Sequence, residues 1–422
     1  MSLAEGAASE NSSRVSQYWE RQFEKNRTDP SLWTNNDIVT RHIYRLISGG
    51  SEEHWLGWFF NHYLDDGVVF DRSLSVCCGD GAHELGLANT RKVGFIRGFD
   101  LSEGAIAQAS ATLEKAAIPK GSYAFEVADA NDLQMEDSFD LILSSGALHH
   151  VTNLEGLLSK LSNMLGINGY FVLLEYVGPN RFQWTDLQLS VINGILRQFD
   201  SRYLRDNTRV DLSRPKIADM MSVDPSEAVR SEDVLRLLPE YFTIEYRRDI
   251  NGTVMHPLYP LLDGRLTNTN TPDFDSIVRK TLLMEDTLIR EKVLSSDFVF
   301  AIFRNKKLAE APRNSPARQS SKERCFVGYI DLFDDKTVAG WAADLRTPTI
   351  PLRVEVFIDD RLQATILSDA FRQDVKDAGY GDGRKAFLLP LISRKSSPPG
   401  RVAKLRIAGS NHVLAMCIRA VE

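Results

Sequence analysis

Apolar and polar positions alternate between two spacings over residues 67–178. Short apolar runs, the pattern of buried strands, are each followed by a stretch in which apolar residues recur at helical spacing. Strands that alternate with helices in this way predict right-handed strand–helix–strand units and a parallel sheet covered by helices. The pattern therefore indicates an α/β domain.

Helical spacing continues on both sides of this region. Aromatic and aliphatic residues before residue 67 predict a helical cap, which follows a small, polar tail at residues 1–13 that is expected to be disordered. Residues 179–240 and 250–295 carry further helical periods and are predicted to be inserts that cover one end of the sheet. Two more apolar runs, at 242–246 and 296–303, predict strands six and seven.

The pattern changes after a segment rich in proline, serine, alanine and charge at residues 305–323, which reads as a linker. The predicted organisation is a tail and cap at 1–66, the α/β domain at 67–304, and a separate domain at 324–422. In that last domain the short apolar runs are separated by turns, which predicts a small all-β sandwich. Its expected strands are 354–358, 363–367, 386–389, 402–407 and 412–416.

Composition excludes several classes of protein. The 422 residues carry 50 Lys and Arg against 57 Asp and Glu, a net charge of −7, so no basic excess points to nucleic acid. No apolar run reaches the roughly 18 residues that a membrane span needs, and the N-terminus lacks the pattern of a signal peptide. The spacing of the cysteines is not that of a metal site, and a reducing, cytoplasmic location is expected. These cysteines are Cys77, Cys78, Cys325 and Cys417.

The turn at Gly79-Asp80-Gly81 follows the first predicted strand and precedes a helix. Two glycines let the backbone approach a ligand closely, and a helix N-terminus faces the same place. The third glycine of the dinucleotide fingerprint is replaced by Glu84, which argues against a pyrophosphate. A second strand ends at Asp100, at the spacing of an acid that binds ribose hydroxyls. A nucleoside without a pyrophosphate satisfies both observations.

Three further stretches in the same order strengthen this interpretation: residues 127–130, 139–151 and 169–175. With the glycine turn and Asp100 they resemble the class I S-adenosylmethionine (SAM) methyltransferases over about residues 70–304. The family usually has an acidic residue where Ser75 stands and a glycine where Cys77 stands. The resemblance implies a Rossmann-like seven-stranded sheet, SAM as cofactor and S-adenosylhomocysteine as product. It also implies cofactor contacts by Cys77, Gly79, Asp80, Gly81, Asp100, Leu101, Asp129, Ala130 and Ser145.

Methyl transfer to a hydroxyl group benefits from a base, and the base must lie beyond the carboxyl ends of strands four and five. His149 lies at this end of the sheet. It would act as a base, position the acceptor or have only a structural role. Glu175 would be a base, an orienting partner or a strand-end carboxylate without a catalytic role. For His150 a structural role is favoured over a catalytic one. Tyr176 is expected on the acceptor side. No metal is expected, because strand four ends in serines and histidines rather than in converging carboxylates.

The polar turn before the last predicted helix of the first insert holds a second acceptor candidate. Glu227 and Arg230 would contact a polar or anionic acceptor there, or else form an internal ion pair that stabilises the turn.

Motifs in the C-terminal region suggest a biological setting. Residues 328–331, 338–342, 371–375 and 381–383 resemble a β-domain appended to bacterial glycosyltransferases and methyltransferases of surface-polysaccharide pathways. This resemblance implies O-methylation of a sugar or glycan. One alternative is a small-molecule or natural-product methyltransferase whose C-terminal domain serves assembly, as in a homo-oligomer. Another is a non-catalytic glycan-binding scaffold that keeps a vestigial SAM fold. Trp341 is expected in the core rather than as a platform for sugars.

Overall fold

A computed structural model describes most of the chain. Its described residues divide by their internal contacts into two units, Met1–Ile43 with Asp65–Arg318 and Tyr44–Leu64 with Gln319–Glu422. The predicted polar tail lies outside the described residues, as does the predicted linker from residue 307 onward. The described ranges are 14–16, 18–19, 29–65, 67–306, 326–344, 351–359, 361–377, 382–391, 401–408 and 413–418.

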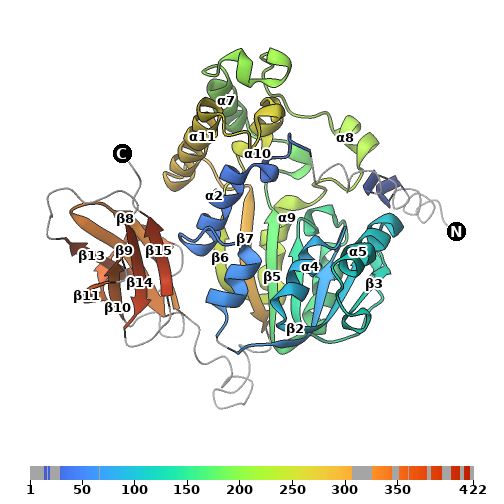
Figure 1. The fold of residues 1–422 in the computed structure, drawn as a ribbon, viewed down its shortest axis with the longest axis horizontal. Helices are drawn as coiled ribbons and strands as arrows, with labels where there is room; N and C mark the ends of the chain where they lie inside the picture. Colours follow the sequence, from blue (N-terminus) through green and yellow to red (C-terminus); the bar gives the residue numbers. More distant parts are fainter. Residues whose placement is uncertain are drawn as a thin grey trace. The chain divides into compact units, whose positions relative to one another are not determined.

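A seven-stranded sheet forms the centre of the first unit, and its strand order is β3-β2-β1-β4-β5-β7-β6 (Figure 1). Neighbouring strands from β3 to β5 are parallel, whereas β7 runs antiparallel to both β5 and β6. This confirms the predicted Rossmann-like α/β sheet of seven strands. The strands are β1 (Phe70–Val76), β2 (Val93–Asp100), β3 (Tyr123–Val127), β4 (Phe139–Ser145), β5 (Leu165–Tyr176), β6 (Phe242–Asp249) and β7 (Phe298–Asn305).

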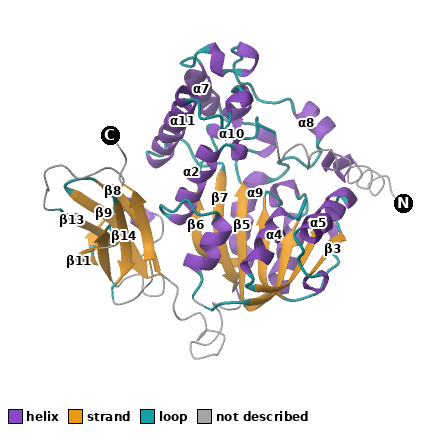
Figure 2. Cartoon of the chain, viewed as in Figure 1, coloured by secondary structure: helices purple, strands orange, loops and turns teal. Residues whose placement is uncertain are grey.

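Helices connect the strands (Figure 2). Two of these helices begin at a side chain that caps them. The Ala105 N–H donates to Ser102 Oγ at 3.1 Å, and the Gly156 N–H donates to Asn153 Oδ1 at 3.2 Å. Serine and asparagine are preferred at this position because their short polar side chains can accept from the first N–H groups of a helix. The connecting helices are α4 (Ala82–Thr90), α5 (Glu103–Lys115), α6 (Leu154–Met164) and α9 (Ser231–Tyr241).

Packing in this unit centres on one buried apolar cluster that includes Leu74 of β1, Ile142 of β4 and Phe171 of β5. Leu158 of α6 and Leu238 of α9 join the same cluster, so these helices pack on the sheet. Burying each large apolar side chain contributes about 1.5–3 kcal/mol, which holds the strand ends, and thus the site, in place.

Two strands differ in extent from the apolar runs of the sequence. The first strand begins at Phe70, although the apolar run begins at Val68, and Val69 is 64% exposed. The strand β5 starts at Leu165, so residues 167–169 lie inside it. There Phe139 pairs with Leu165 but Leu141 pairs with Tyr170, so the extra residues of β5 bulge out of the ladder.

The predicted inserts are helical. Figure 1 shows α7, α10 and α11 grouped beyond the end of the sheet at which β5 stops. In the described ranges, no helix combines the length and the apolar character that crossing a bilayer requires. The insert helices are α7 (Asp186–Leu196), α8 (Ile217–Val223), α10 (Met255–Leu258) and α11 (Pro272–Arg290).

Glu285 of α11 is fully buried and caps the start of α10. Its Oε1 accepts from the Val254 N–H at 2.6 Å and the Met255 N–H at 3.3 Å. Its Oε2 has no hydrogen-bond partner among the described residues. Burial raises the pKa of this carboxyl from 4.5 to about 8, so Glu285 is protonated at neutral pH.

This raised pKa predicts a pH-dependent stability. Above pH 4.5 the unfolded chain releases the Glu285 proton while the folded chain keeps it, so the contribution of this group to stability falls until pH reaches about 8. Glu285→Gln should lack this fall. The free energy of unfolding in urea should be measured for both proteins across that range. As pH rises, Glu285→Gln should become more stable relative to wild type. Glu291→Gln at the exposed end of the same helix is the control, and parallel curves for Glu285→Gln and wild type would contradict the assignment.

The C-terminal unit contains two antiparallel sheets of four strands, in the orders β11-β10-β14-β15 and β12-β13-β9-β8. One buried cluster takes side chains from both, including Val356 and Leu405 of one sheet and Val338 and Phe387 of the other, which confirms a sandwich. The strands are β8 (Phe326–Phe333), β9 (Thr337–Asp344), β10 (Leu352–Ile358), β11 (Arg361–Ser368), β12 (Ala370–Phe371), β13 (Arg384–Pro390), β14 (Val402–Ile407) and β15 (Val413–Ile418).

Two features of this unit were not expected. Trp341 is only half-buried and lies outside the core cluster, because it alternates with the core-facing Gly340 and Ala342 along β9. Residues 44–64, which the sequence predicts as part of the cap, belong by their contacts to this unit. They include the short helix α3 (Trp55–Trp58).

Candidate active site

The turn after β1 is built from residues in the left-handed region. Gly79 has φ 57° and Gly81 has φ 79°. A Cβ on Gly81 would lie 2.8 Å from Ala109 Cα, so only glycine allows α4 to pack this closely on α5. Gly81 does not line the cavity described below, and its role is to shape the turn.

Cys77 also has a left-handed backbone, with φ 49°. This is the position at which the resembling family usually has glycine, and a non-glycine residue there stores strain of about 1–3 kcal/mol. The Cys77 side chain lines the cavity. Burial, together with the charges of Asp100 and Asp129, raises the pKa of its thiol well above the ordinary value, so it stays protonated.

Asp100 ties the glycine turn to the end of β2. The Gly79 N–H donates to Asp100 Oδ2 at 3.1 Å, and the Ser102 N–H donates to Oδ1 at 2.9 Å. The residue is 9% exposed and lines the cavity. The carboxylate still has acceptor capacity beyond these bonds, which suits a hydroxyl group such as those of a ribose.

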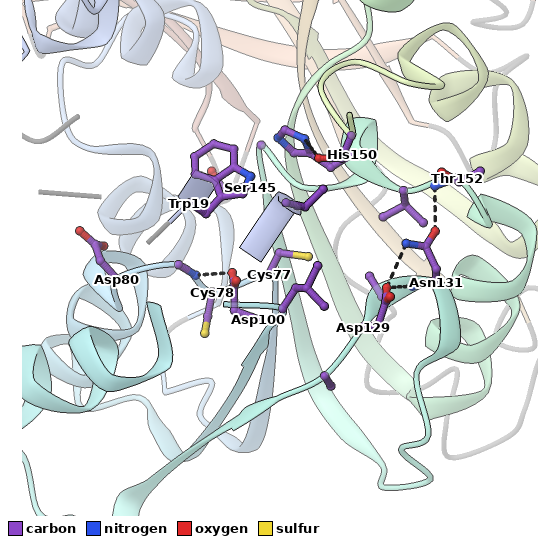
Figure 3. A pocket seen from close by; sticks show the side chains of 18 of the residues that line it. Trp19, Cys77, Cys78, Asp80, Asp100, Asp129, Asn131, Ser145, His150 and Thr152 are labelled. Carbon is purple, nitrogen blue, oxygen red and sulfur yellow. Dashed lines mark hydrogen bonds between the residues drawn. The ribbon is translucent and has the colours of Figure 1, made fainter. Parts of the chain in front are cut away.

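Asn131 is a residue that the sequence analysis missed. The Asn131 N–H and side-chain amide donate to Asp129 Oδ1 at 2.8 and 2.9 Å, while Asn131 Oδ1 accepts from the Thr152 N–H at 2.9 Å and the Asn153 N–H at 3.0 Å (Figure 3). It therefore joins the loop after β3 to the loop after β4. Its one sequence signal was the position two residues after Asp129, typical of an Asx turn.

These loops surround a cavity of about 810 Å³ at the carboxyl ends of β1, β2 and β4 (Figure 3). Its size is that of a small-molecule or cofactor site. All predicted cofactor residues line it except Gly81, and Val15, Trp19 and Leu32 add an apolar wall from the N-terminal region. The lining residues are Val15, Trp19, Leu32, Cys77, Cys78, Gly79, Asp80, Ala82, His83, Asp100, Leu101, Ala128, Asp129, Ala130, Asn131, Ser145, Gly146, His150, Val151, Thr152, Asn153, Pro225 and Ser226.

Glu175 organises the loop after β4 from the end of β5. Its Oε2 accepts from the Ala147 N–H at 3.0 Å and the Leu148 N–H at 2.7 Å. Its Oε1 accepts from the Tyr176 N–H at 2.9 Å and is hydrogen-bonded to His149 Nδ1. Because the buried carboxylate can only accept, the proton of a neutral His149 sits on Nδ1 and leaves Nε2 with a free electron pair.

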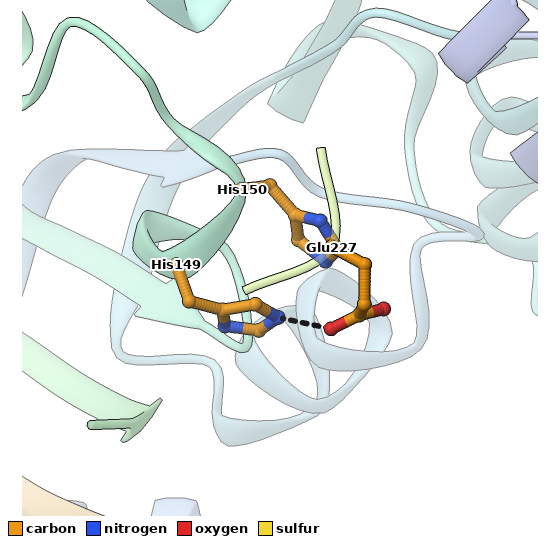
Figure 4. A group of neighbouring side chains, drawn as sticks. All are labelled: His149, His150 and Glu227. Carbon is orange, nitrogen blue, oxygen red and sulfur yellow. Dashed lines mark ion pairs between the residues drawn. The ribbon is translucent and has the colours of Figure 1, made fainter. Parts of the chain in front are cut away.

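The free Nε2 of His149 faces Glu227, whose Oε1 is 3.6 Å away (Figure 4). Burial lowers the pKa of His149, but Glu175, Glu227 and Asp224 raise it more, so on balance it lies above the ordinary 6.5. Desolvation raises the pKa of Glu227 in turn. The sequence predicts His149, Glu175 and Glu227 as separate candidates, and the structure brings them together.

His150 lies between this group and the cavity. It lines the cavity, whereas His149 is behind it with ring centroids 4.1 Å apart. The His150 Nδ1 is 3.1 Å from Ser226 Oγ, and the Trp19 ring meets the His150 ring edge-on at 5.3 Å. Burial and the neighbouring His149 hold the pKa of His150 well below 6.5, so it stays neutral.

Two predicted acceptor residues lie elsewhere. Arg230 pairs with Glu155 at 2.6 Å and Asp233 at 2.8 Å, so the alternative of an ion pair with Glu227 is wrong. Tyr176 is 2% exposed and donates its hydroxyl to Pro179 O at 3.0 Å. It supports the His149 ring edge-on from 5.9 Å and does not line the cavity.

The first unit combines a mixed sheet with one antiparallel strand and a cavity that meets an acid at the end of β2, which is the architecture of class I SAM-dependent methyltransferase domains. The family model described as a methyltransferase domain matches residues 71–208.

Known proteins show similar sequences and folds. Demethylmenaquinone methyltransferases of two serovars of Leptospira interrogans are 34% identical over 113 residues, which is 26% of this chain and 45% of theirs. The chain thus spans less than half the length of these relatives. Geranyl diphosphate C-methyltransferase from Streptomyces coelicolor is 12% identical, with a TM-score of 0.37, over 59% of this chain and 76% of its own. A SAM-dependent methyltransferase from Mesorhizobium loti is 20% identical, with a TM-score of 0.34, over 59% and 96%.

Proposed function

We propose that this protein transfers the methyl group of SAM to a hydroxyl group of its acceptor. The oxygen–carbon bond forms as the carbon–sulfur bond of the sulfonium breaks, S-adenosylhomocysteine leaves, and the hydroxyl proton passes to His149 Nε2. When bound, SAM supplies the activated carbon, and the protein supplies position and a proton acceptor. The Glu175–His149 hydrogen bond carries this proposal, because it holds the proton on Nδ1 and leaves the Nε2 electron pair free to accept a proton.

The two histidines are given different tasks. His149 is the better base, because carboxylates raise its pKa, whereas the pKa of His150 is lowered. His150 borders the cavity and is hydrogen-bonded to Ser226. We therefore assign His150 to positioning the acceptor and His149 to accepting its proton.

The lining of the cavity supports a small-molecule acceptor with an apolar part. Val15, Trp19, Leu32 and Pro225 give the cavity apolar lining, and Trp19 contacts His150. Such a lining gains by covering apolar surface, whereas a sugar would leave its hydroxyl groups unpaired there. The relatives are likewise named for demethylmenaquinone rather than for a sugar.

A glycan or nucleotide-sugar hydroxyl is the second candidate acceptor. It rests on the resemblance of the C-terminal motifs to β-domains of polysaccharide enzymes. The observation that favours it is that the C-terminal sandwich has its own hydrophobic core. A tethered second module would raise the effective concentration of a polymeric acceptor.

An acceptor screen tests both candidates. Full-length protein and isotopically labelled SAM are incubated with apolar phenols and alcohols, with nucleotide-sugars and with polysaccharides. We expect label in the first set. Label only in sugars would transfer the proposal to the second candidate. SAM binding without transfer to any set would favour a non-catalytic scaffold.

The position of the pH–rate profile is a further prediction. His149 must be unprotonated to act, so kcat/KM should fall as pH drops below its pKa, with a midpoint above 6.5. Glu227→Gln removes a negative charge that favours the imidazolium, so it should move the midpoint to lower pH. Glu155→Gln, which removes a carboxylate paired with Arg230 instead, should leave the midpoint in place. An unmoved midpoint in Glu227→Gln would contradict the assignment.

A further inference from the structure

Three side chains form a compact group of potential metal ligands, which we call the His–His–Glu cluster: His149, His150 and Glu227. One ligand atom of each lies within 4.8 Å of the others (Figure 4). Imidazole nitrogen with carboxylate oxygen is the donor set of Zn²⁺ and related divalent transition metals. The cluster joins the loop after β4 to the turn before α9.

The spacing of the cluster fits one small ion. Ligand atoms about 2.0–2.1 Å from a tetrahedral centre lie roughly 3.4 Å from each other. His149 Nε2 and Glu227 Oε1 are 3.6 Å apart, close to this spacing. The remaining ligand atoms lie within 4.8 Å of one another, so side-chain rotations that bring them closer would complete the site.

The surroundings of His149 are those of a metal ligand. Protein histidines that bind metal donate their other ring N–H to a carboxylate or carbonyl, which fixes the tautomer and the ring plane. Glu175, itself held by the Ala147 and Leu148 N–H groups, plays this part for His149 Nδ1. The ring is therefore oriented before any ion arrives.

The excess of carboxylates around the cluster also favours a bound cation. Asp224 is 2% exposed, and its Oδ2 has no hydrogen-bond partner in the part of the chain that the structure describes. This oxygen lies 3.8 Å from His150 Nδ1. The nearby Arg181 donates to the backbone carbonyls of Glu227 and Pro225 at 2.8 and 2.7 Å rather than to a carboxylate. The two imidazoles of the cluster are therefore close to three carboxylates, those of Glu175, Glu227 and Asp224.

We infer that the His–His–Glu cluster binds a divalent transition-metal ion of the Zn²⁺ type, with Asp224 as a nearby carboxylate. This goes beyond the proposed function, in which the reaction needs no metal. One consequence rests on that function: the ion and the hydroxyl proton need the same Nε2 electron pair, so bound Zn²⁺ should inhibit methyl transfer.

Titration calorimetry of metal-free, full-length protein with ZnCl₂, without SAM or acceptor, tests the site. We expect a single ion per chain. Glu227→Gln and His150→Gln should each weaken binding, and Glu175→Gln should weaken it roughly 10- to 100-fold through loss of orientation. His83→Gln, in the same cavity wall but outside the cluster, should bind like wild type. Thermal unfolding of each variant shows that it is folded.

Absence of stoichiometric Zn²⁺ binding, or equal affinity in wild type, Glu227→Gln and His150→Gln, would overturn the inference. Because no methyl transfer is measured in this experiment, a failure to bind Zn²⁺ would not contradict the proposed function. A failure to transfer methyl groups would likewise not contradict the ion site. Once an acceptor is known, turnover that Zn²⁺ lowers and a chelator restores would support the shared electron pair. Unchanged turnover with the ion bound would refute it.

Discussion

His149→Ala is expected to lower kcat by roughly 10²- to 10⁴-fold, the usual contribution of a positioned general base. Among the imidazoles that the structure describes, this ring alone has its Nδ1 held by a buried carboxylate and its pKa raised by its neighbours. Because His149 lies behind the cavity wall, its loss should leave SAM affinity nearly unchanged. A fall in kcat without a change in SAM binding would separate proton transfer from cofactor binding.

His150→Ala is the matched comparison, since it removes an identical side chain from the next position. It should raise KM more than it lowers kcat, because His150 borders the cavity and has a lowered pKa. Turnover measured over a range of acceptor concentrations gives both kcat and KM, and calorimetry checks the affinity for SAM. A larger loss of kcat in His150→Ala than in His149→Ala would reverse the two assignments.

Glu175→Gln should have nearly the effect of His149→Ala. If the Gln oxygen keeps the Ala147 and Leu148 N–H groups, its amide NH₂ faces His149 Nδ1 and donates to it. The imidazole proton then moves to Nε2, and the free electron pair is lost from the acceptor side. The same NH₂ also opposes the Tyr176 N–H, so some stability should be lost.

Two controls keep the Glu175 result interpretable. Glu126→Gln, which alters a partly exposed ion pair with Arg97, should keep full turnover. The free energy of unfolding reports the structural part of the Glu175→Gln effect separately. Full turnover in a folded Glu175→Gln protein would show that the orientation of His149 does not matter.

Asp100→Ala is expected to weaken SAM binding by roughly 5- to 150-fold, about 1–3 kcal/mol for buried donors left unpaired. The side chain holds the Gly79 and Ser102 N–H groups and offers its remaining acceptor positions to the ribose. Its removal therefore loosens the glycine turn as well as the ligand.

Calorimetry with SAM and with S-adenosylhomocysteine measures this effect. Asp132→Ala, an exposed carboxylate outside the cavity lining, is the control and should bind like wild type. Asp100→Asn should lose less than Asp100→Ala, because one oxygen still accepts. Unchanged SAM affinity in Asp100→Ala would remove Asp100 from the cofactor site.

Local patterns in the sequence were enough to predict the sheet and most of the residues that were expected to gather at one cavity. Strand and helix periods depend on neighbours a few residues apart, so the seven strands could be predicted directly. Parallel strands end at the same edge of a sheet. The turn at Gly79 and the acid at Asp100 were therefore expected to meet, and a hydrogen bond joins them.

Tertiary structure alone decided which charged groups face one another. Glu227 and Arg230 are three residues apart in the chain, yet Glu227 faces His149 and Arg230 pairs with Glu155. The path of the first insert across the end of the sheet sets these partners, and no local period encodes that path. The same holds for Gly81, whose need for glycine comes from Ala109 on another helix. Composition, spacing and periodicity thus determined the elements of this protein and the edge of the sheet at which the cavity lies. The packing of distant segments determined the environment of His149, because pKa values and ion pairs depend on distances in space.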